Sequence, residues 1–143
     1  VMPTLLGLCG LPIPNSVEGL DFSGYIRGSA DPTDGAVVIS CPHPFGQWNK
    51  PRRGGVEYRG LYTRRYTYAR TLEGPWLLYD NQADPYQMDN LTGRAEAAEL
   101  QAELDARLHA KLRAVGDEFL PGMEYIRRWG HTVDETGTVP YTK

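Results

Sequence analysis

Histidine and cysteine are the side chains of this 143-residue chain best suited to covalent or acid–base chemistry, and few are present: His43, His109, His131, Cys9 and Cys41. Cys41 and His43 stand two positions apart, a spacing that could suggest a nucleophile and its base. Two residues of one loop rarely reach that geometry, so we do not expect Cys41 and His43 to act as a nucleophile and its base. Prolines on both sides stiffen the backbone at His43, which favours a structural or ligand-contacting role for this loop.

Metal- and phosphate-binding motifs are missing from the sequence. There is no C-x-x-C pair, no H-E-x-x-H and no EF-hand loop, so we predict no metal site and no cofactor in this chain. Two cysteines permit one disulfide but do not indicate one. Asn90-Leu91-Thr92 matches the glycosylation sequon, which we interpret as the turn and cap before the long helix.

Charge is concentrated in residues 50–70, called here the basic segment. It holds seven cations, Lys50, Arg52, Arg53, Arg59, Arg64, Arg65 and Arg70, against one anion, Glu57. Tyrosines alternate with the arginines, a combination that can bind nucleic acid or another polyanion. The simpler alternative is a hairpin whose arginines pair with acids elsewhere in the chain. The residue types alone favour this second interpretation, so no nucleic-acid partner is favoured.

These residues need a scaffold, and the length suits one domain with a modest core. Strands are expected at 36–40, 58–62, 65–70 and 76–80, where β-branched and aromatic residues lie between turn signals. Leucines recur every fourth residue in a helix at 95–115, with Val115 extending the stripe. The fold class is therefore α+β, a small antiparallel sheet of about four strands packed by one long amphipathic helix. No apolar run approaches a membrane span, and the compartment stays open.

Residues 58–70 and 76–91 resemble the C-terminal region of the sulfatase family. There an R-x-(I/L)-R-T-x-x-(Y/W)-K-Y segment precedes E-L-Y-D-L-x-x-D-P-x-E-x-x-N-L. The residues that fall on this pattern are Arg59, Leu61, Thr63, Tyr66, Tyr68, Leu78, Tyr79, Asp80, Asp84, Pro85, Asn90 and Leu91, whereas Tyr62, Thr67 and Gln87 depart from it. Residues 2–12 and 17–23 are similar to the helix and the segment that come before this region in the family.

The resemblance implies the C-terminal subdomain of an alkaline-phosphatase-like α/β/α enzyme that hydrolyses sulfate esters. The family uses a calcium ion and a formylglycine made within C/S-x-P-x-R, a motif that neither Cys9 nor Cys41 begins. We therefore expect a fragment without the catalytic centre, whose partner is the missing N-terminal catalytic domain. Residues 1–35 would end the main domain and form a linker, 36–130 the C-terminal subdomain, and 131–143 an extended tail.

The loop at residues 41–55 is the expected contact with substrate. It is long and stiffened by prolines, and it leads into the basic segment, which would attract anions. In the parent enzyme we expect His43, Gln47, Trp48 and Lys50 to contact a sulfated small molecule or sugar at the pocket rim. The alternative is that Phe45 and Trp48 only fill an interface between domains.

Overall fold

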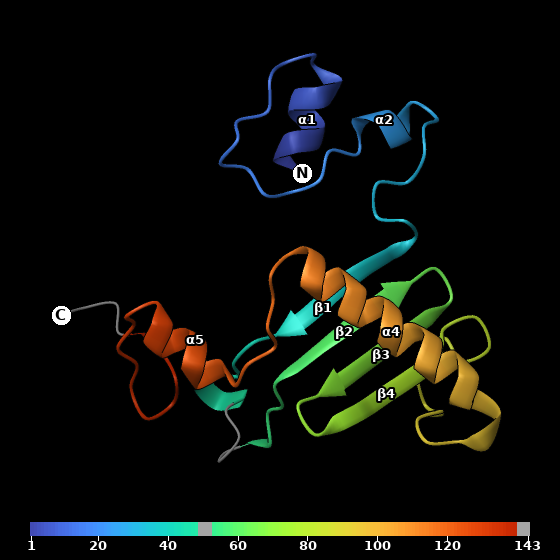
Figure 1. Cartoon of the computed structure of the whole chain (residues 1–143), viewed down its shortest axis with the longest axis vertical. Coiled ribbons are helices and arrows are strands. Elements are labelled where there is room, and N and C mark those ends of the chain that lie inside the picture. The colour runs from blue at the N-terminus through green and yellow to red at the C-terminus, as the bar shows by residue number, and fades with distance from the viewer. Residues whose placement is uncertain (49–52, 140–143) are drawn as a thin grey trace. The chain divides into compact units, whose positions relative to one another are not determined.

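The computed structural model describes residues 1–48 and 53–139, and Figure 1 shows its elements. The chain divides into two compact units, Val1–Ala36 and Val37–Lys143. In the part of the chain that the structure describes, no helix is both long and apolar enough to cross a membrane.

The first unit holds two short helices, α1 (Met2–Leu8) and α2 (Ser23–Ile26). Pro3 lies in the first turn of α1, where a missing N–H costs no helical hydrogen bond. Thr4 Oγ1 accepts a hydrogen bond from the backbone N–H of Phe22 at 3.1 Å. The Arg27 guanidinium donates to the Leu8 carbonyl at 2.9 Å, which satisfies a free acceptor at the end of α1. Helix α1 lies within residues 2–12, where the resemblance implies a helix.

A four-stranded antiparallel sheet forms the centre of the second unit. Its strands are β1 (Ala36–Cys41), β2 (Tyr58–Thr63), β3 (Tyr66–Thr71) and β4 (Gly74–Asp80), arranged in the order β1-β2-β3-β4. In register, Leu61 lies opposite Tyr68, and Tyr68 lies opposite Leu78. These three side chains occupy one face and are fully buried, so this row across the sheet is the core.

Helix α4 (Ala98–Ala114), preceded by the 3-10 turn η2 (Ala95–Ala97), lies across that face of the sheet (Figure 1). Leu104, Leu108 and Leu112 are buried, which confirms the leucine stripe and the α+β fold. The expectation that Val115 extends the stripe is wrong, because Val115 is 75% exposed. Helix α4 ends at Ala114, so Val115 is the C-cap residue outside the helix and does not continue its buried face; Gly116, with a φ of +69°, then turns the chain.

Arg59 connects the sheet to the chain between α4 and the next helix, α5 (Gly122–Arg128). Its side chain is only 3% exposed and donates to both carboxylate oxygens of Asp117, at 2.5 and 3.3 Å. The guanidinium also lies over the rings of Phe119 and Tyr125, at 4.9 and 5.8 Å. This arrangement holds the start of α5 beside the loop that carries His43.

Residues 131–139 carry a turn within the segment expected to be an extended tail. The Asp134 carboxylate accepts hydrogen bonds from the N–H groups of Thr136 and Thr138, at 2.8 and 3.0 Å. The Thr136 carbonyl accepts one from the N–H of Gly46 at 2.9 Å. This bond ties the turn to the His43 loop beside the 3-10 turn η1 (Gly46–Trp48).

Candidate functional site

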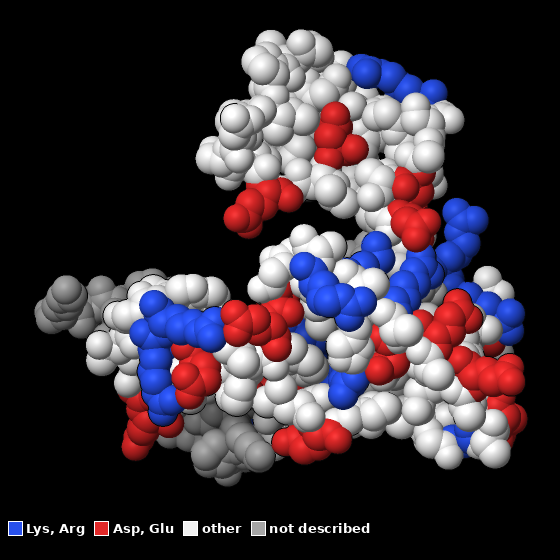
Figure 2. All heavy atoms as spheres, in the orientation of Figure 1, with Lys and Arg blue, Asp and Glu red and all other residues white. Residues whose placement is uncertain are grey.

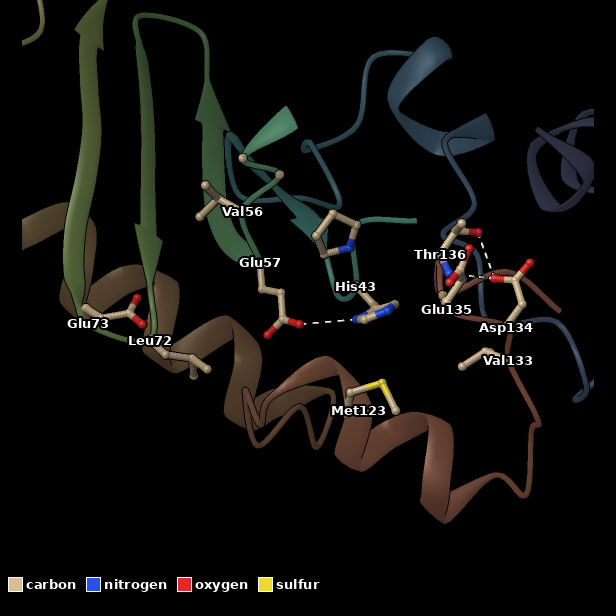
Figure 3. A pocket seen from close by; sticks show the side chains of 14 residues that line it. His43, Val56, Glu57, Leu72, Glu73, Met123, Val133, Asp134, Glu135 and Thr136 are labelled. Atoms are coloured by element: carbon tan, nitrogen blue, oxygen red, sulfur yellow. Dashed lines mark hydrogen bonds and ion pairs between the residues drawn. The ribbon is translucent and has the colours of Figure 1, made fainter. Parts of the chain in front are cut away.

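A cavity of about 640 Å³ lies where the His43 loop, the approach to β2, the β3–β4 turn, α5 and the 134–138 turn meet. Its lining comprises His43, Pro44, residues 54–57, Leu72, Glu73, Met123 and residues 133–137. Figure 3 shows these side chains around the space, with His43 between Glu57 and the turn. The cavity therefore combines apolar walls with several polar groups, as ligand sites do.

His43 and Glu57 form the central polar pair of the cavity. His43 Nδ1 lies 3.2 Å from Glu57 Oε1, and both side chains are about a quarter exposed, at 23% and 25%. The other oxygen of Glu57, Oε2, accepts a hydrogen bond from the backbone N–H of Gly122 at 3.1 Å. Glu57 thus connects the histidine to the start of α5.

Two glycines give this pair the space that it occupies. A Cβ atom at Gly122 would lie 2.7 Å from the Cβ of His43 and also too close to the Pro42 carbonyl. A Cβ atom at Gly137 would lie 2.6 Å from His43 Nε2, and Gly137 has a φ of +78°, which side chains disfavour. Both positions require glycine for His43 to keep its place.

Cys41 is not activated beside His43. Burial and then the charge of Glu57 raise the pKa of the Cys41 thiol, which favours the protonated form over the nucleophilic thiolate. His43 directs its Nδ1 to Glu57. Both Cys9 and Cys41 are free thiols.

The structure places only some of the expected contact residues. His43 lines the cavity. Trp48 lies in η1 and is 64% exposed, with the Arg53 guanidinium 5.2 Å from its ring centre, and it is not among the described residues that line the cavity. Gln47 lies in η1, but its side chain, like the whole of Lys50, falls outside the described residues. The substrate contacts of all four residues therefore stay predictions.

Sequence reasoning missed Glu57, Gly122 and the turn around Gly137. One feature of the sequence could have pointed to Glu57: it is the only acidic residue in the basic segment, which also holds seven cationic residues. Its partner His43 lies 14 positions earlier, and Gly122 lies 65 positions later. No local pattern joins residues at those separations.

Three arginines of the basic segment, Arg59, Arg65 and Arg70, pair with acids, as the simpler interpretation of the sequence predicts. Besides the Arg59–Asp117 pair, Arg65 contacts Asp80 at 2.8 Å and Arg70 contacts Asp105 at 2.9 Å. Figure 2 shows cationic and acidic side chains next to one another on this face of the second unit. An independent module for nucleic acid or another polyanion is therefore not favoured.

The sequon asparagine serves the fold in the turn before the helix, as expected. The expectation that this segment also caps the long helix is wrong, because the caps of η2 and α4 are Arg94 and Ala97 and neither makes a side-chain cap hydrogen bond. The side-chain oxygen of Asn90 accepts hydrogen bonds from the N–H groups of Leu78 and Thr92, each at 3.0 Å. Its side-chain nitrogen donates to the Trp76 carbonyl at 3.0 Å. Asn90 therefore fastens the segment before α4 to the edge strand β4.

The described residues, 1–48 and 53–139, contain no cluster of three or more His, Cys, Asp or Glu side chains that could hold a metal ion. Neither cysteine stands in the motif from which formylglycine is made. The residues of this chain thus do not fit the calcium ion and the formylglycine that the resemblance implies, and we assign neither to it.

No family model matches the chain. It is 40% identical over 144 residues to the ulvan-active sulfatase of Formosa agariphila, a match that spans 99% of this chain and 27% of that protein. The endo-4-O-sulfatase of Bacteroides thetaiotaomicron is 31% identical over 131 residues, which cover 82% of this chain and 25% of that protein.

Solved structures show the same fold. A Bacteroides fragilis protein, solved as a candidate sulfatase, matches with a TM-score of 0.61 at 28% identity, covering 82% of this chain and 24% of that one. A protein in complex with its substrate D-glucosamine-2-N,6-O-disulfate matches with a TM-score of 0.64 at 24% identity, over 84% of this chain and 24% of that one.

The chain spans about a quarter of the length of the relatives it matches. Its strand and turn pattern places it with the C-terminal portion of these proteins, which agrees with the four-stranded antiparallel sheet and its covering helix. The chain belongs to the sulfatase family.

Proposed function

We propose that this chain works as the C-terminal portion of an enzyme that hydrolyses sulfate esters of a carbohydrate. Its own role is to hold one side of the substrate pocket, with His43 as the contacting residue and Gln47, Trp48 and Lys50 nearby on the same loop. The division into residues 1–35, 36–130 and 131–143 is part of this proposal.

The observation that carries the proposal is the position of His43 on the wall of the 640 Å³ cavity (Figure 3). That volume falls within the range of roughly 300–1,000 Å³ found for small-molecule sites. The imidazole is fixed on one side by Glu57 and keeps part of its surface exposed. A sugar ring needs this combination of polar groups and apolar walls.

The substrate class follows from the relatives. One acts on ulvan, one is an endo-4-O-sulfatase, and one was solved with a disulfated glucosamine. All three descriptions concern sulfated carbohydrate or sulfate removal, which supports a sulfated sugar as the ligand here.

The chemical step belongs to parts of the enzyme beyond this chain. A formylglycine and a calcium ion would supply the nucleophile and neutralise the charge of the sulfate. The catalytic domain that holds them is the proposed partner. The residues of this chain bind and orient the carbohydrate and help to exclude water from it.

Exchange of segments tests this proposal. The matching quarter of the Formosa agariphila sulfatase is replaced by this chain, and the hybrid is assayed with sulfated oligosaccharides, ulvan fragments included. We expect the hybrid to release sulfate, whereas the same enzyme truncated before the segment does not. The 143-residue chain alone, supplied with calcium, should hydrolyse no aryl sulfate.

A hybrid that folds and cleaves a small aryl sulfate, yet accepts none of the oligosaccharides, would contradict the proposed role in carbohydrate binding. His131→Ala is the matched control for His43→Ala, because His131 lies in the same unit, its ring is beside that of Trp129, and it is not among the described residues that line the cavity. Of these two changes in the hybrid, only His43→Ala should lower the release of sulfate from the oligosaccharides.

A further inference from the structure

We propose that Glu57 is a positioning residue for His43, and that it leaves His43 Nε2 as a hydrogen-bond acceptor in the neutral ring. The group that meets this nitrogen is then a donor, such as a sugar hydroxyl, and not a sulfate oxygen. The second statement rests on the proposed function, whereas the first concerns this chain alone.

Glu57 makes two polar contacts that fix the protonation of His43. An ionised carboxylate only accepts hydrogen bonds, so both groups that touch it must donate. Gly122 donates its backbone N–H to Oε2, and His43 Nδ1 faces Oε1. Nδ1 must therefore carry a proton. A neutral imidazole has one N–H, which leaves Nε2 with a free lone pair.

The carboxylate itself is held in place. One oxygen is fixed by Gly122, the first residue of α5, and the other faces the imidazole, so rotation of the carboxylate breaks both contacts. Figure 3 shows Glu57 and His43 directed toward one another across the cavity wall. A second residue that orients a histidine in this way fixes its tautomer and its direction.

The opposite side of the ring faces Gly137. The missing side chain of Gly137 leaves the space next to Nε2, where a Cβ atom would lie only 2.6 Å away. The turn that contains Gly137 lines the cavity, and so does His43. Nε2 therefore lies on the side of the ring nearest to this turn.

The acceptor nitrogen has a consequence for specificity. A sulfate oxygen is itself an acceptor, so it gains no hydrogen bond from a neutral His43 oriented by Glu57. A hydroxyl or an amide N–H of the sugar does gain one. His43 then selects the unsulfated positions of the carbohydrate.

The tautomer can be measured directly on the 143-residue chain. Long-range nitrogen–proton NMR spectra at pH 8, where imidazole rings are ordinarily neutral, distinguish Nδ1–H from Nε2–H. His43→Ala identifies the His43 signals among those of the three histidines. We expect His43 to be in the Nδ1–H form, and a predominant Nε2–H form in the unaltered chain would overturn the proposal without any variant.

Glu57→Gln sharpens the test because glutamine has only one acceptor oxygen for two donors. If that oxygen stays with Gly122, its NH₂ group faces Nδ1 and the tautomer reverses to Nε2–H. Glu73→Gln is the matched control, since it makes the same change of charge at another residue lining the cavity. Reversal in Glu57→Gln alone supports the proposal, and identical His43 spectra in the unaltered chain and both variants overturn it.

The hybrid enzyme separates this proposal from the proposed function. There we expect Glu57→Gln to raise KM for a sulfated oligosaccharide about 2- to 10-fold, the worth of one hydrogen bond, with little change in kcat. In a His43→Ala background the same change should add no further loss. If the tautomer is Nδ1–H but His43→Ala leaves KM unchanged, the positioning stands and the proposed function fails.

Discussion

Two carboxylates receive hydrogen bonds at the same end of β2, and their surroundings differ. Asp117 meets Arg59, whose side chain is nearly inaccessible and lies over two aromatic rings. Glu57 meets His43, which stays partly exposed on the wall of a cavity. Each pair connects the sheet with the α5 region. Asp117 also lines a cavity, but that cavity is about 320 Å³, whereas the cavity beside the His43–Glu57 pair is about 640 Å³. The comparison indicates that the Arg59–Asp117 pair holds the fold, whereas the more exposed His43–Glu57 pair is the one that we propose for ligand binding.

The largest effect should come from breaking the buried pair. Arg59→Ala leaves Asp117 without its cation and empties the space between Phe119 and Tyr125, so we expect a loss of about 3–5 kcal/mol in the free energy of unfolding. Urea denaturation measures it. Arg64→Ala, on an exposed residue of the β2–β3 hairpin, should change stability by less than about 0.5 kcal/mol. Similar losses for both would show that the buried pair does not hold the fold.

Leu104 tests the core on which both pairs depend. It is 2% exposed and packs from α4 against the sheet, so Leu104→Ala should cost about 2–5 kcal/mol. Met88 is largely exposed, and Met88→Ala is the control measured in the same denaturation series. A change within about 0.5 kcal/mol for Leu104→Ala would mean that the leucine stripe is not the core.

Much of this scaffold could be predicted from the sequence. Leucines four residues apart and runs of β-branched and aromatic residues are local signals, and they located α4 and all four strands to within a few residues. The basic segment was harder, since only tertiary structure brings Arg59 and Arg70 to acids 58 and 35 positions away.

The candidate site was predicted less completely. His43 was expected from its proline-flanked loop, but the orienting carboxylate was not. Gly137 and Gly122 resemble ordinary turn glycines in the sequence, and their need for space appears only when His43 packs against them. Close packing between distant segments leaves no periodic signal.

Gly137→Ala separates backbone strain from contact with the site. Gly130 is the matched control, because it also has a positive φ, +67°, but an added Cβ atom meets nothing within 4 Å. Gly130→Ala should therefore lower the free energy of unfolding by only about 1–2 kcal/mol, the penalty for a side chain in the left-handed backbone conformation. Gly137→Ala should lower the free energy of unfolding by more than this, and it should shift the NMR signals of His43. Equal costs with unmoved His43 signals would contradict the packing described here.

Asp117 should make a smaller, pH-dependent contribution. Burial alone raises its pKa, but hydrogen bonds from Arg59, Tyr125 and the Phe119 N–H outweigh it and lower the pKa below its ordinary value. The stabilisation is therefore complete above about pH 4, the range of an unfolded aspartate, and is lost as pH falls through the lower folded value. Between pH 7 and pH 3, the free energy of unfolding should fall less in Asp117→Asn than in the unaltered chain. An equal fall in both would contradict this.

The most direct test of the role of His43 is the substrate selectivity of the hybrid enzyme. Selectivity here means the ratio of kcat/KM for a sulfated oligosaccharide to kcat/KM for a small aryl sulfate. This ratio is measured for the His43→Ala and His131→Ala hybrids and compared with that of the unaltered hybrid. We expect the ratio to fall only for His43→Ala, because the aryl sulfate does not reach the cavity wall. Equal losses on both substrates, or none, would contradict the account and leave the loop a structural filling between domains.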